Sequence, residues 1–386
     1  MTAHEEDWSR NDVRDCAHPH GIFVALIWAL LSCASRHGNV PHSEAGELSF
    51  DRLEAGQKVQ GKLAANEVHA YRLALSAGQY ARLLVNQPGV DVALELFAPD
   101  GRSLTRVDDP ITSYEPEELG LVAEVSGAYR LEVKATRRRL STGAYEMTIA
   151  ELRPAAPQDT ARVAAERVFA EATELLEGSN AESFRKAVEK FEQALPMWRA
   201  IGDKRGEGRT LALMGFACQR HSLRDREKTT GYLTQALSLH RDAGDRVAEA
   251  FTLNTLGRVY LDAGDAKKAL AQFEQSLDLS RKLGDPMLQA DALKNVATVY
   301  SQRGDHAKAI QYCEQVLALA NAEGDYVQQM NALGTIGYIY SLTDDPPKDV
   351  SYSERALAIA REIGERGIEA ALLNNIAGAS IKLGDQ

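Results

Sequence analysis

The histidine and cysteine residues are the side chains of this sequence best suited to catalysis, but their spacing forms no catalytic motif. The chain contains no Gly-x-Ser-x-Gly, no phosphate-binding Gly-rich loop and no His-Glu-x-x-His. His221, His240 and His306 fall in separate segments, and no His-Cys dyad is apparent. Cys218 and Cys313 occupy apolar positions of a helical pattern, which predicts small buried side chains. We therefore predict no catalytic residue, no cofactor and no metal site, so that the chain is not an enzyme.

Four aspartates near the N-terminal third, Asp91, Asp100, Asp108 and Asp109, are the residues that could ligate a hard cation such as Ca²⁺. They lack the tight spacing of a ligand loop, and Asp100-Gly101 reads as a turn. Solvated loop positions are the favoured interpretation. Calcium binding by this region stays open as part of an alternative function.

Cys33 could accept a lipid, because it follows an apolar segment. Residues 22–31 are ten consecutive apolar residues, which is short for a membrane span and typical of a signal-peptide core. The next residues, Ser32-Cys33, resemble a bacterial lipoprotein cleavage box. The resemblance predicts a leader over 1–43, export to the cell envelope and lipid or membrane attachment at Cys33. Acidic residues upstream of the apolar run count against a basic leader, and a short buried or uncleaved segment is the alternative.

The elements that position the remaining polar residues repeat along the chain. Gly-Asp dipeptides recur with spacings of 42, 40 and 40 residues, and Gly364-Glu365 continues the series after another 40. A second series lies half a period away. Apolar residues recur at helical spacing between these breaks, so each period predicts two helices, A and B. The first series comprises Gly202-Asp203, Gly244-Asp245, Gly284-Asp285 and Gly324-Asp325.

The breaks and the packing positions both have a physical explanation. Glycine adopts the left-handed conformation that ends a helix, and the following aspartate can cap the next one. Small residues on helix A, at Gly215, Gly257, Ala297, Gly337 and Ala377, would let helix B approach closely. Tyrosines three residues after the small position, at 260, 300 and 340, would wedge between helices.

These residues resemble the tetratricopeptide repeat. Leu256-Gly257-x-x-Tyr260 followed by Ala269-x-x-x-Phe273 is the clearest copy of the family's signature. The resemblance implies an all-α superhelix over 159–386, with five helix pairs and one terminal helix at 366–383. That last helix would leave Ile376, Ile381 and Leu383 without a partner helix, so either the sequence is a fragment or another chain covers this end.

The family resemblance also implies a concave groove lined by helix A that binds a protein or peptide. Only two of the implied contact residues, Arg258 and Lys294, are basic, so the pattern departs from the family's clamp for chain-terminal carboxylates. Asparagine suits a peptide backbone because its amide both donates and accepts hydrogen bonds. The predicted groove residues are Asn254, Arg258, Lys294, Thr298, Tyr338 and Asn374.

Residues 44–153 have strand alternation with period two and frequent Gly and Pro turns, which predicts seven or eight strands in an antiparallel sandwich. The order of short motifs, from Gly61-Lys-Leu to Gly143-x-Tyr145, resembles the pre-peptidase C-terminal domain. Residues 154–158, with two prolines, predict a short linker, and Asp159 is the expected cap of the first helix. The predicted fold class is thus multidomain, a β-sandwich followed by a tetratricopeptide superhelix.

The composition limits the function. A formal charge of −11 argues against a nucleic-acid partner, which would need a basic surface. The leader, sandwich and repeats together resemble the N-terminal region of bacterial proteins with a CHAT peptidase domain. We expect a non-catalytic scaffold for a protein or peptide partner, and the regulatory region of a longer peptidase is one form of it. The alternative is a calcium- or glycan-binding sandwich with the repeats as spacer.

Overall fold

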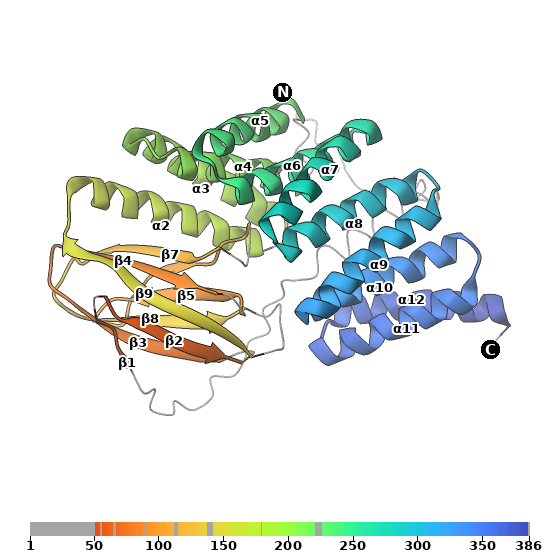
Figure 1. The fold of residues 1–386 in the computed structure, drawn as a ribbon, viewed down its shortest axis with the longest axis horizontal. Coiled ribbons are helices and arrows are strands. Elements are labelled where there is room, and N and C mark those ends of the chain that lie inside the picture. Colours follow the sequence, from red (N-terminus) through yellow and green to blue (C-terminus); the bar gives the residue numbers. More distant parts are fainter. Residues whose placement is uncertain are drawn as a thin grey trace, which may run out of the picture.

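The computed structural model describes residues 51–386 apart from 55, 65–66, 88–89, 112–114, 137–141, 179, 221–225 and 385–386. The predicted leader and Cys33 lie outside the described residues. Two sheets of the N-terminal region pack face to face, and a long array of helices follows them along an arc (Figure 1). The predicted fold class, a β-sandwich followed by a helical repeat array, is confirmed.

The sandwich consists of a five-stranded sheet in the order β1-β3-β8-β5-β6 and a four-stranded sheet in the order β2-β9-β4-β7. Leucines and tyrosines on the facing sides of the two sheets form one buried core. The strands are β1 Asp51–Arg52, β2 Lys58–Leu63, β3 Val68–Leu75, β4 Gln79–Asn86, β5 Val92–Phe97, β6 Ser103–Val107, β7 Glu117–Val122, β8 Gly127–Ala135 and β9 Gly143–Pro154.

Two details of the sandwich differ from the prediction. The described residues contain nine strands instead of seven or eight, and β1 runs parallel to β3, so the sandwich is not wholly antiparallel. Two paired residues are too few to produce a period-two signal in the sequence. Leu53 holds this edge, since its side chain is buried and its N–H donates to the carbonyl of Arg72 at 2.9 Å.

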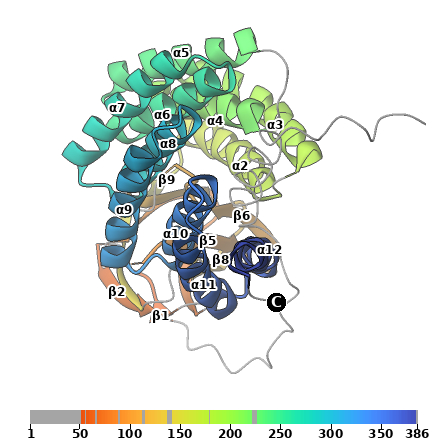
Figure 2. The ribbon, with the colours of Figure 1, turned by 90° about the vertical axis from the view of Figure 1, so that its right-hand side faces the viewer.

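The helices form five antiparallel pairs followed by α12, and from α4 onward each A helix also contacts the A helix of the next pair. The A helices therefore line the inner side of the arc and the B helices its outer side (Figure 2). The A helices are α2 Pro157–Glu177, α4 Lys204–Arg220, α6 Arg246–Asp262, α8 Pro286–Gln302, α10 Tyr326–Leu342 and α12 Arg366–Leu383. The B helices are α3 Ala181–Ile201, α5 Arg226–Ala243, α7 Ala266–Leu283, α9 His306–Glu323 and α11 Pro346–Ile363.

The corners between helices have the predicted Gly-Asp geometry. Gly284 ends α7 with φ 69°, and Asp285 accepts the N–H of Leu288 at 2.9 Å. The same cap recurs at Asp245, Asp265, Asp305, Asp325 and Asp345. Asp344 is the exception, because it takes φ 57° without being glycine, at the corner where the sequence pattern is degraded.

The small residues on the A helices have the predicted packing role. A Cβ on Gly257 would lie 2.5 Å from the Phe273 ring, and one on Gly337 would lie 2.7 Å from Ser353 Oγ. Tyr300 stacks on Tyr312 with 5.5 Å between ring centroids, so this tyrosine does pack between helices. Ala377 on α12 is exposed, because no described helix covers it.

The junction between sandwich and helices is shorter than the predicted linker 154–158. β9 ends at Pro154 and α2 begins at Pro157, which leaves only residues 155 and 156 between them. The N-cap is Ala156, so the prediction of Asp159 as the cap was wrong. Asp159 lies in the first turn, where its carboxylate accepts the Ala156 N–H at 2.7 Å and pairs with Arg153 at 2.6 Å. This bidentate pair starts the helix directly from the strand.

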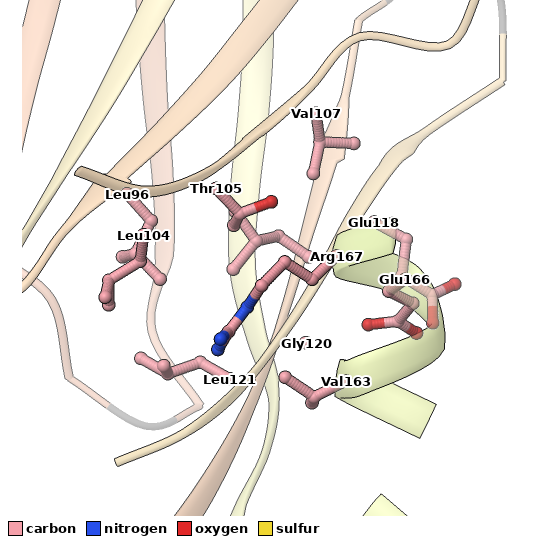
Figure 3. A pocket seen from close by; sticks show the side chains of 11 residues that line it. Leu96, Leu104, Thr105, Val107, Glu118, Gly120, Leu121, Val163, Glu166 and Arg167 are labelled. Atoms are coloured by element: carbon pink, nitrogen blue, oxygen red, sulfur yellow. The ribbon is translucent and has the colours of Figure 1, made fainter. Parts of the chain in front are cut away.

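The joint between the two parts is formed where α2 lies against β6 and β7. Figure 3 shows Glu166 and Arg167 of α2 beside Glu118 and Gly120 of β7, around a small pocket lined by both apolar and charged side chains. A Cβ on Gly120 would lie 2.6 Å from Glu166 Oε2, so the glycine makes room for the carboxyl group. Desolvation, together with the charge of Glu118, raises the pKa of Glu166 to about 7. The joint therefore contains an acid that is half protonated near neutral pH.

We expect this joint to weaken as the pH rises. Because the pKa of Glu166 is raised above its unfolded value of 4.5, the stability from its burial is full below pH 4.5 and is lost as the pH rises through 7. E166Q should remove this loss, and urea midpoints measured at pH 5.5, 6.5 and 8 test it. E171Q, at an exposed residue of the same helix that pairs with Lys190, is the matched control. Parallel pH profiles for wild type and E166Q would contradict the prediction.

Candidate partner-binding face

The inner face is the surface that the A helices α4, α6, α8, α10 and α12 present to the inner side of the arc. The structure places all six predicted groove residues on the last four of these helices: Asn254, Arg258, Lys294, Thr298, Tyr338 and Asn374. Their surroundings differ: Asn254, Lys294 and Thr298 form internal hydrogen bonds or ion pairs, whereas Arg258 forms none with a described residue.

Asn254 connects two neighbouring A helices. Its Oδ1 accepts a hydrogen bond from Nδ2 of Asn295 at 2.9 Å, and both side chains are about nine-tenths buried. Sequence reasoning missed Asn295, because its position relative to Ala297 is one residue later than that of Asn254 relative to Gly257. The offset is a consequence of the stagger between α6 and α8. Asn254 therefore links α6 to α8, and its Oδ1 is already engaged in a hydrogen bond within the protein.

Lys294 and Thr298 are also satisfied within their own helix. Lys294 Nζ forms an ion pair with Asp291 at 2.6 Å, and the Thr298 hydroxyl donates to the carbonyl of Lys294 at 3.0 Å. Both residues remain half-buried at the surface. A partner would meet the lysine as a neutralised ion pair, so it contributes little unpaired charge.

Arg258 is the predicted groove residue with the most unusual environment. Its side chain is half-buried and forms no ion pair or hydrogen bond with any residue that the structure describes. Desolvation lowers the pKa of its guanidinium, while the carboxylates of Asp262 and Asp291 act in the opposite direction from a distance. A desolvated cation without a contact partner is costly, and an anion supplied from outside would offset that cost.

Arg220, at the end of α4, is a second desolvated arginine near Arg258, and the sequence analysis did not predict it. Burial and the charge of Arg258 lower the pKa of Arg220 to about 10, while Asp291 opposes the shift. Its guanidinium carbon lies 5.9 Å from the ring centroid of Phe216. Arg220 precedes the segment 221–225 that interrupts the repeat spacing, so the periodic count of groove positions passed over it.

The inner face changes character along the array. Tyr338 on α10 is half-buried, and burial raises the pKa of its phenol. Asn331, on the same side of α10, has a buried Oδ1 without a hydrogen-bond partner among the described residues. Asn374 on α12 is exposed. The face is thus basic near α4 and α6 and neutral but polar near α10 and α12.

The four aspartates considered as cation ligands are not gathered into one site. Each accepts a hydrogen bond or ion pair from a different protein group, and among the described residues no cluster of three or more His, Cys, Asp or Glu side chains suits a metal ion. The groups are the Thr136 hydroxyl for Asp91, the Arg102 N–H for Asp100, Arg106 for Asp108 and Arg209 for Asp109.

Neither described cysteine resembles a nucleophile. Cys218 and Cys313 are buried and form no disulfide among the described residues, and desolvation raises the pKa of Cys313 to about 12. The Cys313 thiolate that nucleophilic chemistry would need is therefore not populated at neutral pH. In the described part of the chain, no helix has the length and apolar character of a membrane span.

Comparison with known proteins supports the repeat assignment. The sequence model of the tetratricopeptide repeat family matches residues 221–282 and 288–362. No curated protein sequence matches the chain. Residues 221–282 and 288–362 of the helical region therefore match tetratricopeptide repeats, a type of repeat that commonly serves as a scaffold for protein interactions.

Solved structures resemble both parts of the chain at low sequence identity, which bears on the fold alone. A Rap protein complexed with Competence and Sporulation Factor has 16% identity and a TM-score of 0.50, covering 59% of this chain and 66% of that one. A STAND ATPase with a tetratricopeptide repeat sensor from Pyrococcus horikoshii has 19% identity and a TM-score of 0.49, covering 58% of this chain and 34% of that one.

The sandwich has a neighbour of the predicted type. The pre-peptidase C-terminal domain of collagenase from Bacillus anthracis has 15% identity and a TM-score of 0.23, covering 27% of this chain and 98% of that one. This chain spans about a third of the STAND protein and about two thirds of the Rap protein.

We expect Arg258 to contribute nothing to folding stability. R258M keeps the length of the side chain and removes a desolvated charge, so the free energy of unfolding should stay unchanged or rise by up to about 1 kcal/mol. K294M is the matched comparison, because it removes the ion pair with Asp291 and should cost about 0.2–1 kcal/mol. Urea midpoints of the three proteins measure both effects. A clear loss of stability in R258M would assign Arg258 to the fold instead of to a partner.

Proposed function

We propose that the chain is a non-catalytic scaffold of the cell envelope that binds a protein or peptide partner across the inner face of its repeats. The single observation that carries this proposal is Arg258, a desolvated cation on that face without an ion pair among the described residues. The proposed contact residues are Asn254, Arg258, Lys294, Thr298, Tyr338 and Asn374, with Arg220 added from the structure.

The geometry of the repeats supports this function over catalysis. The inner face offers backbone-compatible polar groups, two guanidinium groups and a tyrosine on successive helices, which suits an extended chain lying across several repeats. The similar Rap structure is complexed with Competence and Sporulation Factor, so a fold of this kind accommodates a partner.

Charge reversal on the inner face tests the proposal. We expect an array of 12-residue peptides of varied composition to contain binders of the wild-type chain, and R258E/K294E should weaken them at least tenfold, about 1.4 kcal/mol. K282E, at an exposed lysine on the outer helix α7, is the control and should leave binding unchanged. An equal effect of both variants, or the absence of binders, would contradict binding at this face.

The N-terminal segment supports a second part of the proposal, attachment to the membrane through a lipid on Cys33. We expect radiolabelled palmitate to label the wild-type chain in a bacterial host and not to label C33S, and we expect C33S to move from the membrane fraction to the soluble fraction. Membrane association that persists without Cys33 would point to an uncleaved hydrophobic segment instead.

The order of leader, sandwich and repeats also supports the narrower proposal that this region regulates a CHAT-type peptidase. The coding sequence downstream of Gln386 tests it. An in-frame domain with a histidine and a cysteine nucleophile would support a regulatory role, and a stop codon would leave a stand-alone adaptor.

A further inference from the structure

Two described segments between β6 and β7, residues 108–111 and 115–116, reach from the sandwich to the helix array. Ile111 is only 1% exposed and packs in a core cluster with Ala172 of α2, Phe184 of α3 and Leu211 of α4. This loop therefore contributes an aliphatic side chain to the helical core, although it belongs to the sandwich in sequence.

Two carboxylates of the same loop, on either side of Ile111, bind arginines of α4. Asp109 Oδ2 lies 2.6 Å from Arg209 Nη1. Glu115 accepts from Arg205 Nη2 at 3.0 Å and also from Arg209. Ile111 thus lies in the sequence between two acidic residues, Asp109 and Glu115, and both carboxylates form ion pairs with arginines of α4.

A third carboxylate completes this cluster from the helix side. Asp245, the cap of α6, accepts from Arg209 Nε at 2.9 Å and from Arg205 Nε at 3.0 Å. Burial alone would raise the pKa of Asp245, but Arg209 lowers it to about 2. The side chain of Arg209 is 14% exposed and forms ion pairs with three carboxylates, those of Asp109, Glu115 and Asp245.

The docked loop occupies a position that corresponds to the inner face of the later repeats. Arg209 stands six residues before the small residue Gly215, as Asp291 stands before Ala297 and Asn331 before Gly337. Equivalent positions in a repeat array face the same direction. The sandwich loop therefore lies on the first part of the inner face, against α4.

The next cations along this face are Arg220 on α4 and Arg258 on α6. In contrast to Arg209, whose carboxylate partners raise its pKa, both have lowered pKa values because they are desolvated. Arg258, which forms no ion pair with a described residue, would gain from an added carboxylate. Arg209 is thus paired with carboxylates of this chain, whereas Arg258 has no carboxylate at contact distance among the described residues.

Building on the proposed function, we infer that the partner segment is extended and acidic, and that it docks at Arg258 as Asp109 and Glu115 of the β6–β7 connection dock at Arg205 and Arg209. The loop is the built-in occupant of the first part of the inner face, and the partner binds the part that follows. Because the whole chain carries a net charge of −11, the attraction is local and is screened by salt within a Debye length of about 8–10 Å.

A peptide that copies residues 106–118 is the probe, since it has the chemistry that the chain already binds. Fluorescence anisotropy with the full chain should show binding, and an analogue with Asn for Asp and Gln for Glu should bind at least tenfold more weakly. R258E should abolish binding and K282E should leave it unchanged. Raising the salt from roughly 0.05 M to 0.5 M should weaken it, because exposed charges are then screened.

Two further variants keep the result interpretable. R258M removes the charge without reversing it and should weaken binding in a protein whose circular dichroism is unchanged. D109N/E115Q releases the loop from Arg205 and Arg209, so the chain should then bind two peptides instead of one. A stoichiometry that stays at one would overturn the assignment of the loop as an occupant of this face.

The outcomes separate this inference from the proposed function. If the acidic peptide and its neutral analogue bind equally, or neither binds while neutral peptides of the array still bind in a manner that depends on Arg258, then the acidic specificity is wrong and the scaffold function stands. If no peptide of any composition binds, both fail. Self-association that R258E abolishes would assign the face to the loop of a second copy and would also overturn the inference.

Discussion

The corner made by a left-handed glycine and a capping aspartate is the constraint on which the helical region depends. It ends one helix and starts the next within two residues, so A helices of 17 residues alternate with B helices of 18 from α6 to α11. Constant lengths keep the small residue of each A helix opposite its B helix, as at Gly257 and Phe273. They also keep successive A helices in contact, and a continuous inner face is the consequence. The position of Arg258 relative to Asp291, in different repeats, follows from this geometry.

Electrostatics then distinguishes two uses of arginine on the same face. Arg209 is buried among Asp109, Glu115 and Asp245, so its desolvation is offset by three close carboxylates and its role is architectural. Arg258 is also desolvated, but the acids nearest to it, Asp262 and Asp291, act only from a distance. A fold gains nothing from a cation in that state, whereas a binding surface does. This difference, and not the number of charged residues on the face, identifies the candidate site.

The sequence predicts what depends on local spacing and fails where contacts join distant segments. The period, the Gly-Asp corners and the small positions such as Gly257 are local, and the structure bears them out. The pairing of Asn254 with Asn295 depends on the stagger between two helices, which no single repeat contains. Arg220 stands at an irregularity in the spacing, and Ile111 lies in a β-connection whose burial partners are all helical. No periodic count could have assigned Arg220 to the inner face or Ile111 to the core of the helix array.

The docked β6–β7 loop also argues against the repeats as a mere spacer for an independent sandwich. The two parts are joined by two residues between β9 and α2, by the ion pair of Arg106 with Glu177 at 2.9 Å, and by the carboxylates on Arg209. These ties lie on different elements, so they fix the direction of the array as well as its distance from the sandwich. If a lipid on Cys33 holds the chain at a membrane, the sandwich sets the orientation in which the inner face meets its partner. The sandwich then has a mechanical role in binding.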